Sequence, residues 1–176
     1  MLTAMHSGAD VRVVGAQHRT TVVARALATG GLHCRCLTPG EATRRPGSIL
    51  GAHIIVWAFP PGSHPTIEAE GYASGAIGCY AHWGSESAEV GPITVEGAGP
   101  CPACLHASPA EPGDHTDPLL GMWAAALAAL QCDALLRTGR SELIGASWRW
   151  RLGAPGLALA RWPGRCDCRA VECGQL

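Results

Sequence analysis

The chain has 176 residues, 47% of them hydrophobic, and a formal net charge of −1. These values suit one domain with a full core and argue against nucleic acid as a partner, because nucleic-acid binding needs a basic face. All 13 basic residues are arginine, and lysine and asparagine are absent, so no step that needs either side chain can run on this chain alone.

The N-terminal residues lack the basic and apolar stretches of a signal peptide. The longest apolar run, residues 119–130, would span about 18 Å as a helix, which is too short for a bilayer core. We therefore expect a cytoplasmic protein with no membrane contact. In that compartment the closely paired cysteines, from a total of 9, indicate metal ligands rather than disulfides.

The first half of the chain alternates between strand and helix signals. Short β-branched or apolar runs predict strands, and apolar residues at helical spacing predict helices. We expect strands at residues 11–14, 32–37, 52–59, 76–82 and 90–96, helices at 20–28 and 65–74, and a Pro/Gly-rich loop through residues 39–47. This alternation over the first 80 residues predicts a parallel sheet with crossover helices.

The second half predicts one long helix and a hairpin. Residues 119–138 form an alanine-rich apolar helix that ends at Gly139. In residues 144–152, Trp148 and Trp150 alternate with Arg149, which predicts a strand buried on one face. This strand is expected to pair with residues 157–162.

The fold class is therefore α/β: a Rossmann-like, mostly parallel sheet with crossover helices, then C-terminal antiparallel strands and a four-cysteine zinc knuckle. We expect one domain over residues 1–176. Its Rossmann-like part covers about residues 10–97, and the knuckle, helix and hairpin cover about residues 98–170. Residues 107–118, rich in Pro and Asp, are expected to form a surface loop.

Two cysteine pairs carry the strongest chemical signal. Cys101 and Cys104 stand in a Cys-x-x-Cys turn stiffened by Pro100 and Pro102, and Cys166 and Cys168 form a second pair far along the chain. Zinc takes four ligands in a tetrahedron, and four thiolates leave no position open for water, so the predicted zinc is structural. Cys173 is an alternative fourth ligand, and a disulfide or unligated thiols are the alternatives to zinc.

The other cysteines are expected to be packing residues. Cys34 and Cys36 could form a second metal site. However, the two side chains would point to the same face of a buried strand, which favours small core residues. Cys79 and Cys132 fall in a strand and a helix, where a thiol packs as a small apolar group.

The segment 90–104, Val-Gly-Pro-Ile-Thr-Val-Glu-Gly-Ala-Gly-Pro-Cys-Pro-Ala-Cys, precedes the long helix, and Arg-Trp-Pro-Gly-Arg-Cys-Asp-Cys follows at 161–168. This order resembles the ThiF-like fold of ubiquitin-activating-type adenylating enzymes. It is more similar to the ThiF-like part of the proteins that assist cyclodehydratases, which close Cys, Ser and Thr side chains of peptides into azoline rings. The resemblance covers about residues 10–170 and implies zinc, a peptide-modifying partner and pairing into dimers.

The nucleotide-binding residues of that family are missing. Active members of the family that this chain resembles carry the motif Gly-x-Gly-x-x-Gly after the first strand. In this chain the corresponding sequence is Gly-Ala-Gln-His-Arg-Thr, starting at Gly15. The acidic residue after the second strand, the Asp after the third, and the Asn and Lys are also absent. We therefore expect no ATP site of that type. Gly15, Arg19 and Arg25 are the candidate phosphate contacts that remain. Because the chain begins close to the first expected strand, we expect no leader-peptide-binding segment before it.

We therefore expect a non-catalytic zinc-binding scaffold or docking subunit in the biosynthesis of azole- or azoline-containing ribosomal peptides. One alternative is a small ATP-dependent adenylating or sulfur-transfer enzyme of the ThiF type. Another is a dinucleotide-binding oxidoreductase, for which the glycine fingerprint and the ribose-binding acidic residue are lacking. Apolar residues surround the helix at 119–138. We therefore expect a homodimer, or a heterodimer with a cyclodehydratase or other modifying enzyme, built on this helix and the strand that follows.

Overall fold

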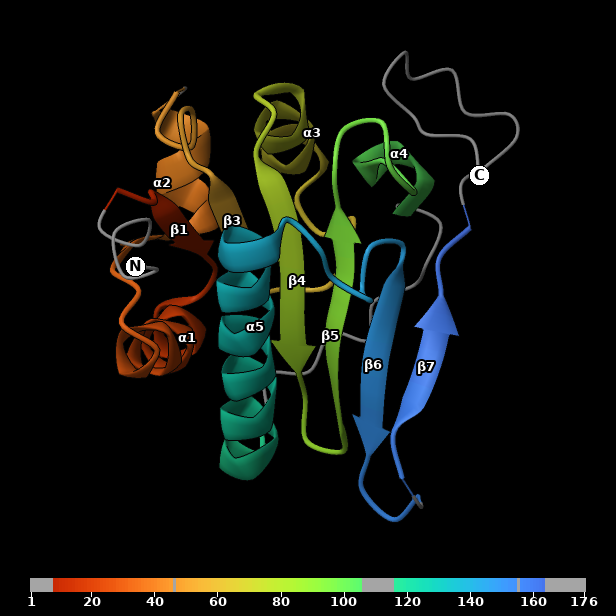
Figure 1. Ribbon diagram of the computed structural model, residues 1–176. Helices are drawn as coiled ribbons and strands as arrows, with labels where there is room; N and C mark the ends of the chain where they lie inside the picture. The colour runs from red at the N-terminus through yellow and green to blue at the C-terminus, as the bar shows by residue number, and fades with distance from the viewer. Residues whose placement is uncertain (1–7, 46, 106–115, 155, 164–176) are drawn as a thin grey trace.

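One mixed sheet organises the computed structural model, which describes residues 8–45, 47–105, 116–154 and 156–163 (Figure 1). In the described residues the strand order is β2-β1-β3-β4-β5-β6-β7. The strands are β1 (Val11–Val14), β2 (Cys34–Leu37), β3 (Ile54–Trp57), β4 (Ile77–Trp83), β5 (Ser87–Thr94), β6 (Ala146–Arg151) and β7 (Ala158–Arg161). The helices are α1 (Gln17–Thr29), α2 (Pro39–Arg44), α3 (Pro65–Ala73), α4 (Pro102–Leu105) and α5 (Pro118–Thr138).

The four strands β2, β1, β3 and β4 are parallel, which confirms the prediction for the first half of the chain. Every residue of β1 and β3 is buried, because helices cover both faces of this part of the sheet. Strand β1 pairs with β2 on one side and with β3 on the other. The carboxyl ends of β1 and β3 therefore flank the topological switch point of the sheet.

Strands β5, β6 and β7 are antiparallel to their neighbours, as predicted for the C-terminal part. The prediction that β6 is buried on one face only is wrong. Burial instead falls along the strand, from buried Ala146 and Ser147 to exposed Trp150 and Arg151. Ala146 and Ser147 pair with the end of β7, whereas Trp150 and Arg151 lie at the turn end of the hairpin, beside the start of β5.

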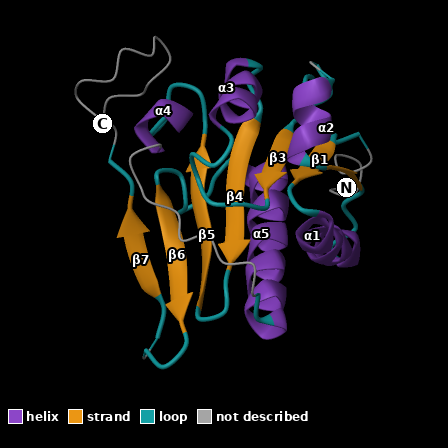
Figure 2. Ribbon diagram, turned by 180° about the vertical axis from the view of Figure 1, so that it is seen from behind, coloured by secondary structure: helices purple, strands orange, loops and turns teal. Residues whose placement is uncertain are grey.

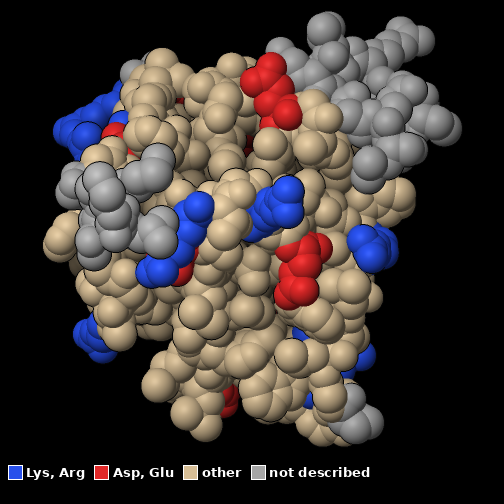
Figure 3. Space-filling view, viewed as in Figure 1, with Lys and Arg blue, Asp and Glu red and all other residues tan. Residues whose placement is uncertain are grey.

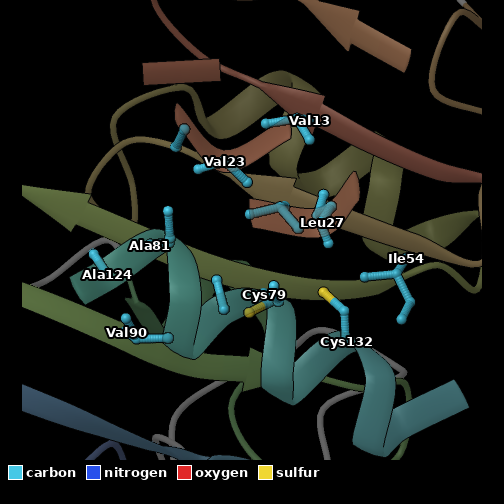
Figure 4. Close-up of a cluster of buried hydrophobic side chains, with 14 of the residues drawn as sticks. Val13, Val23, Leu27, Ile54, Cys79, Ala81, Val90, Ala124 and Cys132 are labelled. Carbon is cyan, nitrogen blue, oxygen red and sulfur yellow. The ribbon is translucent and has the colours of Figure 1, made fainter. Parts of the chain in front are cut away.

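Helices α1 and α5 pack on one face of the sheet, and α2, α3 and α4 pack on the other (Figure 2). The first core joins Val23 and Leu27 of α1 to the alanines of α5 and to alternate residues of the strands (Figure 4). The second core surrounds Trp57 and Tyr80. Two separate cores on the two faces make a three-layer α/β/α arrangement.

Helix α5 is capped by Asp117, whose carboxylate accepts the N–H groups of Leu119 and Leu120 at 2.8 and 2.9 Å. It ends at Thr138 and is followed by Gly139, which adopts φ 66°. In the described part of the chain, α5 is also the one helix long and apolar enough to cross a membrane, with a mean hydropathy of 1.6. In the fold, 44% of that stretch is buried, and α5 packs against α1, β4 and β5. A core helix passes the same test of length and composition.

Helix α2 replaces part of the loop predicted through residues 39–47. Thr38 accepts a hydrogen bond from the Glu41 N–H at 3.2 Å, while the Glu41 carboxylate accepts the Thr38 N–H at 2.8 Å. This reciprocal pair is a capping box, and Pro39 occupies the first helical position. The proline and glycine in this segment mark the start of a short helix rather than a loop.

Candidate functional site

The end of β1 is in close contact with the end of β3 at the switch point. A Cβ atom added at Gly15 would lie 2.8 Å from the Ala58 Cβ and 3.1 Å from the Ala58 carbonyl oxygen. Glycine is therefore required here for strand packing. This contact gives Gly15 a structural role. It leaves little room for a ligand between Gly15 and Ala58.

Arg19 lies at the same end of the sheet, in the first turns of α1. Its guanidinium carbon is 4.9 Å from the ring centroid of Trp83, which is a cation–π distance. Burial lowers the pKa of Arg19, and its Nη1 has no hydrogen-bond partner among the described residues. Arg25 is exposed and lies about 9 Å further along the helix axis. The two arginines thus occupy different positions on α1, with only Arg19 near Gly15.

A buried carboxylate of α3 binds the loop between β3 and α3. Glu68 is 1% exposed and accepts the N–H groups of Gly62 at 2.8 Å and His64 at 2.7 Å. It also accepts the Tyr80 hydroxyl at 2.6 Å. Burial and the Glu68 charge raise the pKa of Tyr80 well above its usual value. The N–H groups of Gly62 and His64 are therefore already bound by the Glu68 carboxylate.

The Cys-x-x-Cys segment lies at the start of α4, on the face of the sheet that carries α3. Cys101 and Cys104 are 2% and 7% exposed, and their Sγ atoms are 3.8 Å apart. That distance is too long for a disulfide, in which the sulfurs are about 2.05 Å apart. Two thiolates at about 2.3 Å from a tetrahedral zinc would lie about 3.8 Å apart, so the observed spacing fits two zinc ligands.

The end of β7 approaches the Cys-x-x-Cys segment. A Cβ atom added at Gly145 would lie 3.2 Å from the Pro100 side chain and 3.7 Å from the Trp162 carbonyl oxygen. The Trp162 N–H also donates to the Gly145 carbonyl at 2.9 Å. Gly145 thus bridges the residue before Cys101 and the residue at the end of the hairpin.

The other predicted zinc ligands, Cys166 and Cys168, and the alternative ligand Cys173 lie outside the described residues. Within the part of the chain that the structure describes, no three His, Cys, Asp or Glu side chains are grouped to hold a metal ion. The described residues therefore supply two of the four predicted zinc ligands.

A buried polar cluster joins β4, β5, β6 and the end of β7. The Glu89 carboxylate accepts the Ser147 hydroxyl and the Arg149 Nε at 2.9 Å. Ser147 in turn accepts the Trp162 Nε1–H at 2.9 Å, and His82 Nε2 lies 3.9 Å from the same carboxylate. The alternation along β6 was predicted to place Arg149 on the face opposite Trp148 and Trp150. Glu89 and His82 were not predicted as part of a site, because the register between β5 and β6 is not encoded locally.

Burial lowers the pKa of His82 to about 4; the Glu89 charge opposes this shift, and Arg19 and Arg149 reinforce it. The imidazole is therefore neutral near pH 7. Ser147 is fully buried, so its hydroxyl is not accessible as a nucleophile. The contacts of this cluster connect β4, β5, β6 and the end of β7.

An apolar groove of about 830 Å³ runs between α1 and α5. His18 and Arg25 of α1 line one side, and Met122 and Leu130 of α5 line the other. Leu119, Met122 and Leu130 are 74%, 62% and 65% exposed, and Figure 3 shows a wide uncharged surface over the lower part of α5. A contiguous apolar surface of this kind is typical of a binding face.

The fold is thus a three-layer α/β/α arrangement in which a parallel half-sheet continues into an antiparallel hairpin. No family model and no curated protein matches the sequence. Among solved structures, a heterocyclase in complex with substrate and cofactor is similar at a TM-score of 0.73 and 15% identity, over 94% of this chain and 25% of that one. The heterocyclase TruD is similar at 0.70 and 16%, over 94% of this chain and 27% of that chain.

The Escherichia coli enzyme MccB, solved with MccA, is similar at a TM-score of 0.73 and 13% identity, over 97% of this chain and 68% of that one. A further MccB structure is described as the microcin C7 biosynthetic enzyme in complex with N-formylated MccA. The chain spans about a quarter of the length of the two heterocyclase chains. At these identities the likeness shows a shared fold.

Proposed function

We propose that this chain is a zinc-bound, ThiF-like docking subunit for an enzyme that modifies ribosomally made peptides. The observation that carries the proposal is the shared fold with both heterocyclases and MccB, combined with a switch point that this chain has filled with its own groups. The fold argues for the peptide-modifying class, and the filled switch point argues against a catalytic role within it.

The argument against nucleotide chemistry rests on the two loops at the carboxyl ends of β1 and β3. Ala58 occupies the space beside Gly15, and Glu68 takes the N–H groups of Gly62 and His64. A phosphate needs such backbone donors to be available. The absence of lysine from the whole chain removes the usual point charge for phosphate. The chain would then depend on a partner for ATP-driven steps.

The zinc proposal rests on the thiol spacing and on the path of the hairpin. Cys101 and Cys104 fit one edge of a tetrahedral site, and Trp162 at the end of β7 lies near Pro100. The second cysteine pair begins four residues after Trp162. A structural zinc held by Cys101, Cys104, Cys166 and Cys168 would tie the hairpin to α4 without an open coordination position.

The partner face proposed here is the groove between α1 and α5. Helix α5 leaves three large side chains exposed along one stripe, beside a groove that is apolar along most of its length. A modifying enzyme, or a second copy of this chain, would cover that stripe. This placement leaves the zinc segment, on the opposite face of the sheet, free of the interface.

The test is reconstitution of a heterocycle-forming enzyme and its precursor peptide from the same genome. With Mg-ATP, mass spectrometry should show one water lost per ring closed, and the yield should depend on adding this chain. A docking role also requires that the chain alone exchanges no pyrophosphate into ATP. Exchange by the chain alone would support the ThiF-type adenylating enzyme instead, with Arg19 as the phosphate contact. Ring formation that is indifferent to the chain would overturn the docking proposal.

A further inference from the structure

Two cysteines lie side by side at one edge of the sheet, far from the Cys-x-x-Cys segment. Strand β2 is the outermost strand beyond β1 in the described sheet, and it carries Cys34 and Cys36. Residues two apart in a strand point to the same face. Cys36 is exposed and Cys34 is half-buried. The expectation that both are small core residues is therefore wrong for Cys36, because β2 is an edge strand rather than a central one.

The contacts of the two thiols place them on the α1 face of the sheet. The Cys36 Sγ lies 3.9 Å from the Thr20 carbonyl oxygen of α1. Cys34 packs at the border of the core formed by α1 and α5. The neighbours His33 and Arg35, which alternate with them along the chain, are both exposed. Cys36 is therefore exposed to solvent, whereas Cys34 packs against the core.

The backbone geometry disfavours a disulfide between these cysteines. Two residues apart in an extended strand, the Cα atoms are about 6.6 Å apart, close to the upper limit for a disulfide of about 6.8 Å. Both residues are also held in register by β1, with Cys34 opposite Val11 and Cys36 opposite Val13. A bound ion that bridges the two sulfurs at a separation longer than a disulfide bond would leave the strand geometry unchanged.

We propose that Cys34 and Cys36 bind one copper(I) ion as a two-thiolate site, separate from the predicted zinc site. Thiolates select soft ions such as copper(I) and also bind zinc. Zinc requires four ligands, and the described residues group no third His, Cys, Asp or Glu side chain with this pair. Copper(I) can be two-coordinate, so the thiolates of Cys34 and Cys36 supply all the ligands it needs.

Binding exchanges protons for the metal and changes no oxidation state. Copper(I) and two thiols give a bis-thiolate complex and two protons. Because binding releases protons, the apparent affinity should rise with pH.

The experiment titrates the full chain anaerobically with copper(I) supplied from a coloured chelator. The first equivalent should transfer to the unaltered chain. In Cys36→Ser the affinity should fall about 100-fold or more, because loss of an outer-shell partner alone costs 10–100-fold. Cys132→Ala, which removes a thiol from the core, is the matched control and should retain the site.

Alkylation mapping gives a second readout that does not depend on a variant. Iodoacetamide should label the exposed Cys36 quickly in the metal-free chain and slowly after one equivalent of copper(I). An unchanged labelling rate at Cys36, or a Cys36→Ser variant that binds as tightly as the unaltered chain, would overturn the proposal. Transfer of copper(I) to Cys101 and Cys104 alone, with Cys36 still labelled, would do the same.

Discussion

The Ser147 hydroxyl carries two hydrogen bonds that hold the hairpin to β5. It donates to the Glu89 carboxylate and accepts the Trp162 Nε1–H. Ser147→Ala would leave a buried carboxylate short of one donor and an indole N–H without its acceptor. We expect the free energy of unfolding to fall by about 1–3 kcal/mol, measured by urea denaturation.

The matched control for this change is Ser85→Ala, in an exposed turn between β4 and β5. It should alter the free energy of unfolding by no more than about 0.5 kcal/mol. If the two variants lose the same stability, the Glu89 cluster does not fasten the hairpin.

His82 should make the stability depend on pH. Its pKa is lowered from 6.5 to about 4 in the fold. Between these values the unfolded chain binds a proton that the folded chain does not, so stability falls as the pH drops from about 6.5 to 4. His82 contributes its full stabilisation above pH 6.5, and the loss below it is on the order of 3 kcal/mol.

Urea titrations at pH 7 and pH 4.5 measure this effect. His82→Gln, which does not titrate, should lose less stability between the two values than the unaltered chain. His33→Gln, at an exposed site, should behave as the unaltered chain does. An equal loss in all three proteins would assign the pH dependence to the carboxylates instead.

The two thiols at the start of α4 lead to a metal prediction. Elemental analysis of the purified chain should give about one zinc per molecule, as a four-thiolate site requires. Cys101→Ser should release the zinc and lower the melting temperature, because binding of structural zinc is coupled to folding. Cys79→Ser, in β4, is the control and should keep the zinc. Full zinc occupancy in Cys101→Ser would reject this ligand assignment.

At the scale of elements, Gly121 shows how packing overrides helix propensity. It lies in the second turn of α5, and a Cβ atom there would be 2.7 Å from the Trp83 Nε1 and 2.9 Å from its Cε2. Alanine favours a helix over glycine by about 1 kcal/mol. We expect Gly121→Ala nevertheless to destabilise the fold, because an overpacked core typically costs about 1–3 kcal/mol.

Differential scanning calorimetry would compare Gly121→Ala with Ala126→Gly, an exposed position in the same helix. Ala126→Gly should cost about 1 kcal/mol through propensity alone. A higher melting temperature for Gly121→Ala would mean that the Trp83 ring moves freely, and that α5 is not held against β4 at this point.

The elements that were predictable from the sequence are those with a strong local signal. Helix α5 was placed nearly to its ends, because its apolar run is long and Gly139 stops it. Helix α2 was missed, since its capping box lies in a segment rich in turn residues. The exposure of Cys36 was also missed, because a strand as short as β2 (Cys-Arg-Cys-Leu) gives the same local signal at the edge and at the centre of a sheet.

Sites made by distant strands were less accessible to sequence analysis. The Cys-x-x-Cys pair follows from its spacing, and the two sulfurs lie 3.8 Å apart; their role as zinc ligands stays a prediction. The Glu89 cluster depends on a register between β5 and β6 that nothing local specifies, so neither Glu89 nor His82 was anticipated. Similarly, the contact of Gly15 with Ala58 depends on how β1 and β3 are aligned.

At the scale of the whole molecule, the two faces of the sheet present different surfaces. The face with α2, α3 and α4 carries the cysteine pair and Glu68. The face with α1 and α5 carries the apolar groove and an uncharged area (Figure 3). A protein that docks through the second face would leave the first unobstructed, so zinc binding and association should be separable by mutation.

Association is the prediction that follows from this separation. Leu119, Met122 and Leu130 project from α5 beside the groove, and large exposed apolar side chains in a row are typical of an interface. We expect the purified chain to be a homodimer in light scattering at micromolar concentration. If the proposed peptide-modifying enzyme is the partner, adding it should give a heterodimer through the same stripe.

Met122→Glu combined with Leu130→Glu should convert the homodimer to a monomer, because two carboxylates per chain would be buried without partners. Both positions are exposed in the isolated chain, so the melting temperature of the monomer and its zinc content should not depend on the substitution. Leu50→Glu, at an exposed apolar position on the other side of the fold, is the control and should remain dimeric. A mass of one chain for the unaltered protein, unchanged when the modifying enzyme is added, would show that α5 is a core helix with an uncovered outer stripe and no partner.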